Sequence, residues 1–145
     1  MKSVALYLGF FFFLYLMYQQ FHWQVSGENF YSNHLLFERL YNEIAKNSDE
    51  IAEKIVGLFG KDAINISEQL SAFKAINDKS IDLDESTFRD YVEKALVVES
   101  DFQKYLTNLK NELENDKKLT LGFDDMLMGH VSDSENRCYL LKQSI

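Results

Sequence analysis

The sequence predicts an all-α fold, because few residues interrupt its helices and its apolar residues recur at helical spacing. The chain of 145 residues has no proline and only 6 glycines, whereas a β sandwich with many turns needs more of both. Hydrophobic residues make up 46% of the chain, which is a globular composition. We therefore expect a single domain over residues 1–145, long enough to bury a core without disulfides or a structural metal.

The first helix is expected at residues 4–24. Residues 4–18 are continuously apolar or aromatic apart from Gly9, and they include the run from Phe10 to Phe13. A membrane span needs about 20 such residues, and no A-x-A-like cleavage site follows, as a signal peptide would require. A buried helix, covered by neighbours on several sides, is therefore favoured over contact with a membrane.

A second long helix is expected from Phe30 to the glycines at 57 and 60. A short helix around residues 70–76 follows it in a less regular stretch. The apolar residues of the second helix recur every seven positions, which predicts a stripe for packing against other helices. The members of this stripe are Phe30, Phe37, Ile44, Ile51 and Leu58.

Two more long helices complete the pattern. The third begins near the capping candidates Ser86 and Thr87. The fourth follows a polar break at residues 115–118 and is less hydrophobic. Four helices with a long central connection, which itself holds a short helix between the second and third, predict a ferritin-like four-helix bundle.

The charge of the chain argues against nucleic acid as a direct partner. The net charge is −8, from 23 acidic and 15 basic residues, and no basic arm offsets it. The same acidity would attract cations, although a solvated acidic face is the commoner explanation. A single cysteine, Cys138, cannot form an internal disulfide, so a reducing compartment such as the cytoplasm fits best.

Two pairs of candidate metal ligands lie on the second helix. His34 and Glu38 are four residues apart, as are Asp49 and Glu53, so each pair shares one helix face and could hold one metal ion. Fifteen residues separate His34 from Asp49, which at about 1.5 Å of rise per residue exceeds the span of any single ion. Two copies packed antiparallel across a two-fold axis would bring the pairs together in two equivalent sites.

His22 extends this ligand set, because it ends the first helix just before the turn and can approach His34. Two imidazoles with up to three carboxylates suit Fe²⁺, and also Zn²⁺ or Mn²⁺, and the carboxylates would stabilise Fe³⁺ after oxidation. Each element alone has a plainer explanation. A helical carboxylate pair is usually solvated surface, and a histidine near an apolar face is usually a satisfied core residue.

Residues 15–60 carry a motif that resembles the Dps-type mini-ferritins, the DNA-protection proteins of starved cells. The family signature is His-Trp-x-x-x-Gly, then Phe, His and Phe, then Asp-Glu-x-Ala-Glu, and this chain keeps every spacing. The matching residues are His22, Trp23, Gly27, Phe30, His34, Phe37, Asp49, Glu50, Ala52 and Glu53. The order of the helices resembles the family over nearly the whole chain.

The resemblance implies a shell of twelve subunits that oxidises Fe²⁺, preferentially with hydrogen peroxide, and stores ferric mineral. His22 and His34 match the ligands that one subunit gives, whereas Asp49 and Glu53 match those of its two-fold mate. The site could hold one iron or two. Glu38 falls where the family often has an auxiliary Asp. Trp23 matches an aromatic residue beside the site, where it would either intercept radicals or simply pack.

Several features depart from the family or extend it. The first helix is unusually apolar, which would suit a shell contact or a lipid or protein partner. The basic tail that some members use to bind DNA is missing, and Lys54 replaces a frequent Arg. His130 is expected to be structural or exposed. An acidic cluster matches the region of the family's three-fold pores, although solvated helix ends look the same: Glu112, Glu114, Asp116, Asp124 and Asp125.

An iron-oxidising store is therefore the leading hypothesis. The alternatives are a helical structural or membrane-associated assembly protein without redox activity, which the aromatic first helix suggests, and a shell that sequesters metal without oxidising it.

Overall fold

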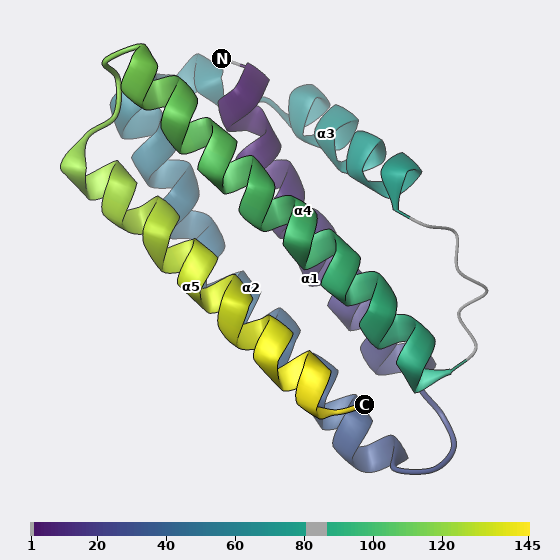
Figure 1. Cartoon of the computed structure of the whole chain (residues 1–145). Helices are drawn as coiled ribbons and strands as arrows, with labels where there is room; N and C mark the ends of the chain where they lie inside the picture. Colours follow the sequence, from purple (N-terminus) through teal and green to yellow (C-terminus); the bar gives the residue numbers. More distant parts are fainter. Residues whose placement is uncertain (1, 81–86) are drawn as a thin grey trace. The chain divides into compact units, whose positions relative to one another are not determined.

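The computed structural model describes residues 2–80 and 87–145. Every regular element in these ranges is helical, as the all-α prediction requires (Figure 1). In chain order the elements are α1 (Lys2–Gln24), α2 (Phe30–Phe59), the 3-10 turn η1 (Lys61–Ala63), α3 (Ile66–Lys79), α4 (Phe88–Asn115) and α5 (Leu121–Gln143). The chain divides into two compact units, Met1–Ala95 and Leu96–Ile145. The expectation of a single domain stays a prediction.

The helix starts follow their capping residues. At the start of α4, the Asp90 amide donates to the Thr87 hydroxyl at 3.2 Å and the Thr87 amide donates to the Asp90 carboxylate at 3.0 Å, a reciprocal cap. Ser86, the other predicted cap, lies outside the described residues. The fourth long helix begins at Leu121, just after the predicted polar break, because Thr120 caps α5 by accepting from the Phe123 amide at 3.1 Å.

The apolar first helix is a core helix of its unit. α1 packs against both α2 and α3, and Phe10, Phe11 and Phe13 are buried, while Phe12 stays 42% exposed. Among the described residues α1 is the one helix long and apolar enough to cross a membrane, yet 67% of its apolar window is buried inside the fold. The prediction of a buried helix is confirmed for most of the phenylalanine run, because two neighbouring helices cover it.

A close helix crossing seats α3 on α1, and Figure 1 shows α3 running alongside the first half of α1. A Cβ atom added to Gly9 would lie 2.6 Å from the Cβ of Ala72 and 3.4 Å from the backbone nitrogen of Phe73. Only a glycine in α1 allows the two backbones to approach this closely. The crossing explains why the apolar run of α1 is broken at Gly9.

The predicted stripe of α2 is buried in its middle and exposed at its ends. Phe37, Ile44 and Ile51 are buried, whereas Phe30 and Leu58 are 43% and 40% exposed. A seven-residue spacing drifts by about 20° per repeat around a straight α-helix. The outermost members therefore rotate away from the buried face.

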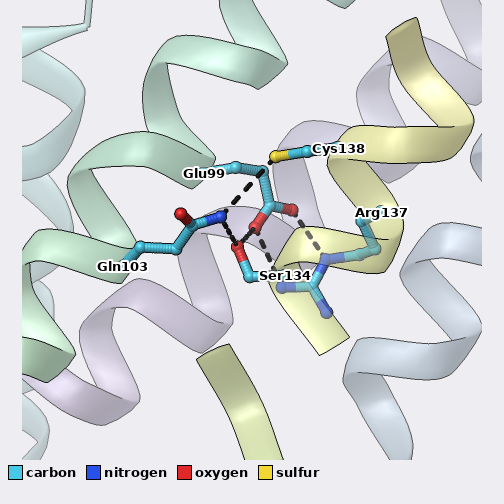
Figure 2. A network of polar contacts seen from close by, with 5 residues as sticks. All are labelled: Glu99, Gln103, Ser134, Arg137 and Cys138. Atoms are coloured by element: carbon cyan, nitrogen blue, oxygen red, sulfur yellow. Dashed lines mark hydrogen bonds and ion pairs between the residues drawn. The ribbon is translucent and has the colours of Figure 1, made fainter. Parts of the chain in front are cut away.

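The second unit contains a buried polar network that the apolar pattern did not reveal (Figure 2). Arg137 on α5 binds Glu99 on α4 through two hydrogen bonds, Nε to Oε1 at 2.7 Å and Nη2 to Oε2 at 2.9 Å. Ser134 donates to Glu99 Oε2 at 2.6 Å, and Gln103 Nε2 donates to Ser134 Oγ at 2.9 Å. Glu99 is 0% and Arg137 2% exposed, so this pair fixes the register of the two helices within the unit.

We expect Gly9→Ala to lower the free energy of unfolding by about 1–3 kcal/mol, because the new methyl group must push α3 away from α1. Gly57→Ala is the matched control: a Cβ there meets nothing within 4 Å, and the change should stabilise α2 by about 0.5–1 kcal/mol. Urea unfolding at equal protein concentration measures both. Equal effects of the two substitutions would contradict the crossing.

We expect Arg137→Met to cost about 3–5 kcal/mol of unfolding free energy, because Glu99 would be left buried without its cation. Arg89→Met removes an exposed pair with Glu93, whose atoms are 3.8 Å apart, and should cost less than about 1 kcal/mol. Chemical denaturation of the two variants separates these values. A double variant, Glu99→Leu with Arg137→Met, should recover much of the loss, and failure of Arg137→Met to exceed Arg89→Met would refute the network's role.

Candidate metal centre

Aromatic packing anchors the helix ends that carry the two predicted histidine ligands. Phe21, next to His22, packs its ring 5.5 Å from Phe37 and 4.8 Å from Tyr91. Phe37 lies one helical turn after His34 on α2 and is fully buried. Such ring pairs add specific geometry to apolar burial. Phe21, next to His22, and Phe37, one turn after His34, are therefore held in a single aromatic cluster.

The turn between α1 and α2 brings the two histidines alongside each other. Gly27 has a φ of 85° and Asn29 a φ of 60°, a left-handed region that glycine and asparagine tolerate best. The Phe30 amide donates to the Gly27 carbonyl at 3.1 Å. These two residues let the chain reverse within the five residues between α1 and α2.

His22 and His34 hold each other through reciprocal hydrogen bonds. Nδ1 of His22 lies 2.8 Å from the backbone oxygen of His34, and Nδ1 of His34 lies 2.7 Å from the backbone oxygen of His22. The rings stack with centroids 3.6 Å apart and planes 20° apart. The oxygen of His22 belongs to the last turn of α1, where carbonyls lack helical partners, so His34 also caps that helix.

These hydrogen bonds determine which nitrogen can bind a metal. A carbonyl oxygen accepts, so each Nδ1 must carry the proton and each Nε2 keeps its lone pair. Neither Nε2 has a hydrogen-bond partner among the described residues. Every fully buried side-chain nitrogen or oxygen in these residues does have a partner. The two Nε2 atoms are therefore not fully buried, and solvent reaches them. A ring nitrogen fixed by a carbonyl while the other stays open is the usual arrangement of a metal-binding histidine.

Glu38 and Tyr41 lie on the next turns of α2. Glu38 is half-buried and has no ion pair within the described part of the chain. The ring of Tyr41 contacts His22 edge-on, with centroids 5.3 Å apart. Burial raises the pKa of the Tyr41 hydroxyl, and the negative charge of Glu38 raises that pKa further, so the phenol stays protonated beside the histidines.

Asp49 and Glu53 do not join the histidines within one chain. Both are exposed on α2, which continues unbroken from Phe30 to Phe59, and helical rise separates them from His34 by roughly 20 Å. In residues 2–80 and 87–145 no three His, Cys, Asp or Glu side chains converge to hold an ion. The full ligand set, including Glu38, stays a prediction that requires a second chain.

Other residues singled out in the sequence have simpler surroundings. Trp23 is 59% exposed and His130 is buried, which fits a structural role for the latter. Lys54 makes no ion pair among the described residues. In the acidic cluster, Asp124 pairs with Lys110 at 2.5 Å, so part of the negative charge expected at a pore is already neutralised.

Cys138 borders a hollow of about 410 Å³ that periodicity could not reveal. Its lining also includes Gln103, whose Nε2 lies 3.7 Å from Sγ. Burial, and then the charge of Glu99, raise the pKa of the Cys138 thiol. A thiol that stays protonated is a poor metal ligand and nucleophile, so we do not place a metal there.

Comparisons with known proteins agree with the fold class. A family model described as a ferritin-like domain matches residues 7–127. The chain is similar to DNA protection during starvation protein 2 of Bacillus anthracis, with 28% identity over 134 residues, which cover 89% of this chain and 84% of that protein.

Two solved structures share the fold at low sequence identity. Dps from Thermosynechococcus elongatus has a TM-score of 0.82 and 20% identity, over 98% of this chain and 87% of that chain. Dps from Staphylococcus aureus has a TM-score of 0.77 and 24% identity, over 99% and 92%. The predicted ferritin-like four-helix bundle with a short helix before the third long helix is thereby confirmed.

The reciprocal hydrogen bonds predict an unusual tautomer. In the neutral ring of both His22 and His34 the proton should reside on Nδ1, whereas histidine in water prefers the proton on Nε2. Nitrogen-15 chemical shifts of the imidazoles in metal-free protein distinguish the two forms. His34→Ala keeps the backbone oxygen that accepts from His22 and should leave the proton of His22 on Nδ1, and an Nε2–H tautomer in the unmodified protein would contradict the observed pairing.

Proposed function

The chain belongs to the Dps-type mini-ferritins of the ferritin-like family, and from this premise we propose that it oxidises Fe²⁺ and stores the iron as ferric mineral. Family membership supports roles in iron storage and in protection of DNA during starvation. The proposal adds a ferroxidase site shared by two subunits of a homo-oligomer, which we expect to be a dodecamer. The observation that carries it is the pair of His22 and His34, each bonded through Nδ1 and open at Nε2.

The ligands come from two chains. His22 and His34 would supply nitrogen from one subunit, with Glu38 as an auxiliary ligand, and Asp49 and Glu53 of the partner subunit would supply oxygen. Imidazole and carboxylate together suit Fe²⁺ and tolerate Zn²⁺ or Mn²⁺. Because Asp49 and Glu53 have no ion pair among the described residues, no competing contact must be broken when a second chain arrives.

The stacking of the histidines favours two ions over one. A metal ion lies in the plane of the imidazole that binds it, and these planes are only 20° apart with centroids 3.6 Å apart. An ion in the plane of His22 therefore lies outside the plane of His34. The two Nε2 atoms would therefore hold two Fe²⁺ ions, one each, with the carboxylates of the partner subunit to balance their charge.

The site residues would assist a two-electron oxidation. Two Fe²⁺ ions give one electron each to hydrogen peroxide, its O–O bond breaks, and two protons complete two molecules of water. The carboxylates balance the charge gained by iron and stabilise Fe³⁺. The net charge of −8 helps to concentrate Fe²⁺ near the shell. Oxygen is the alternative oxidant.

Protection of DNA would then follow from chemistry rather than from direct binding. The acidic balance of these 145 residues opposes contact with a polyanion. Removing Fe²⁺ together with peroxide removes the two reagents that generate hydroxyl radicals. The single cysteine, Cys138, is compatible with the reducing cytoplasm that we propose as the protein's location.

We expect the variant Asp49→Asn with Glu53→Gln to slow oxidation of Fe²⁺ by about 10-fold or more, because it removes two charged ligands. Glu50→Gln, on the same helix but outside the ligand set, is the matched control. Absorbance of ferric iron after mixing with Fe²⁺ and peroxide gives the rates, and native mass checks the assembly. An unchanged rate of Fe²⁺ oxidation in the double variant would show that Asp49 and Glu53 are not ligands of the site.

Mixing subunits tests whether the site is shared. A His22→Ala, His34→Ala chain and an Asp49→Asn, Glu53→Gln chain should each be inactive alone. After co-assembly, about a quarter of the sites should regain all their ligands, since half of the dimers are mixed and each mixed dimer has one intact site. No recovery in verified mixed shells would mean that the ligands do not come from two chains.

A further inference from the structure

A hollow of about 220 Å³ lies in the first unit, between α1, the second half of α3 and the start of α4. Its floor is apolar. Phe13, Met17 and Phe21 recur every four residues and so form one row along α1, and all three are buried. The ring of Phe73 on α3 packs against Phe13, with centroids 5.2 Å apart and planes 61° apart. Packing within the unit therefore holds an aromatic floor in place.

The rim of the hollow is polar and positively charged. Gln20 and Gln24 lie one turn apart on α1, Asn77 belongs to α3, and Lys94 belongs to α4. No carboxylate is present among the described residues that line the hollow, although the chain as a whole has a net charge of −8. A hollow lined by charge of one sign attracts the opposite sign, so this rim favours an anion.

The rim can donate several hydrogen bonds to such an anion. Lys94 is half-buried and also interacts within its own chain. An ammonium group carries three N–H donors, so a ligand can share it with a neighbour. Each carboxamide of the rim adds an NH₂ group, and a carboxylate accepts such bonds through both of its oxygens. The rim therefore matches a carboxylate in charge and in hydrogen bonding.

We propose that this hollow binds a small aromatic carboxylate, a compound with one planar ring and one carboxylate group. The ring lies on the floor, where it contacts the ring of Phe73 and the thioether of Met17, a group that is attracted to aromatic rings. The carboxylate accepts from Lys94 and from the neighbouring carboxamides. The floor thus selects the ring, and the rim selects the charge.

The volume of the hollow limits the size of the ligand. Pockets for drug-sized compounds measure roughly 300–1,000 Å³, and this hollow of about 220 Å³ is smaller. It suits a compound with a single ring and leaves no room for a cofactor with several fused rings. A free small molecule is therefore favoured over a larger partner.

This binding site is separate from the proposed iron chemistry. None of the proposed metal ligands lines the hollow, and the inference requires neither Fe²⁺ nor a second chain. Its failure would leave the proposed function intact, and failure of the proposed function would leave this site intact.

The test uses the assembled, metal-free protein and three probes that separate the ring from the charge. Benzoate has both, benzyl alcohol has the ring without the charge, and acetate has the charge without the ring. Saturation-transfer NMR detects weak binding of small molecules to large assemblies and gives the dissociation constants by titration. We expect benzoate to bind about tenfold more tightly than either other probe, because only benzoate uses both the floor and the rim.

Substitutions place the binding in the hollow. Lys94→Met should weaken the binding of benzoate about fivefold or more and leave benzyl alcohol unchanged, because it removes the charge of the rim. Gln20→Ala, a change at an exposed position, should weaken benzoate to a smaller extent without disturbing the fold. Lys104→Met is the matched control, since Lys104 lies on the same helix in an exposed pair with Asp101 at 3.5 Å. Thermal unfolding verifies that each variant is folded.

Three results would overturn the inference. Benzoate that binds no more tightly than benzyl alcohol or acetate would show that the floor and the rim do not act together. Equal binding to the Lys94→Met and Lys104→Met variants would place benzoate elsewhere on the protein. Tighter binding of N-acetyl-alanyl-phenylalanine than of benzoate would identify the occupant as the end of a peptide chain, and the assignment to a free small molecule would be wrong.

Discussion

The rise of a single uninterrupted helix is the constraint on which the proposed site depends. α2 holds His34 and Asp49 on one rigid rod from Phe30 to Phe59, and no rearrangement short of breaking that rod can bring them to one ion. Hydrogen bonds along the helix thus forbid a site inside one chain. The histidines and the partner carboxylates can meet only when a second copy supplies the missing end.

The fold was largely predictable because its determinants are local. The lack of proline, the position of Gly27 and the cap at Thr87 each act within a few residues, and periodicity identified the long helices. The ends of the α2 stripe, Phe30 and Leu58, were misjudged because a perfect seven-residue repeat drifts around a straight helix. The contact of Gly9 with Ala72 joins residues far apart in sequence, so only the structure reveals it.

For the candidate site, the sequence indicated that the two histidines could meet but not the geometry in which they do. Spacing indicated that His22 could approach His34, yet nothing in the sequence specifies that each imidazole binds the other's carbonyl. Glu99 and Arg137 were missed altogether, because a charged residue within a helix normally indicates a solvated face. Their pairing depends on how α4 and α5 are aligned with each other, and the periodicity within one helix does not give that alignment.

The reciprocal hydrogen bonds of His22 and His34 join the ends of α1 and α2. The same bonds leave the Nε2 atom of each histidine open to a metal ion. Under the proposed function, a newly folded subunit therefore has the histidine ligands in place but lacks the carboxylate ligands of a second chain, so it is inactive. Its complement arrives only with a second subunit. Assembly therefore controls the reaction. Oxidation of iron begins only when the subunits have formed the shell that receives the ferric product, and an unassembled chain does not oxidise iron.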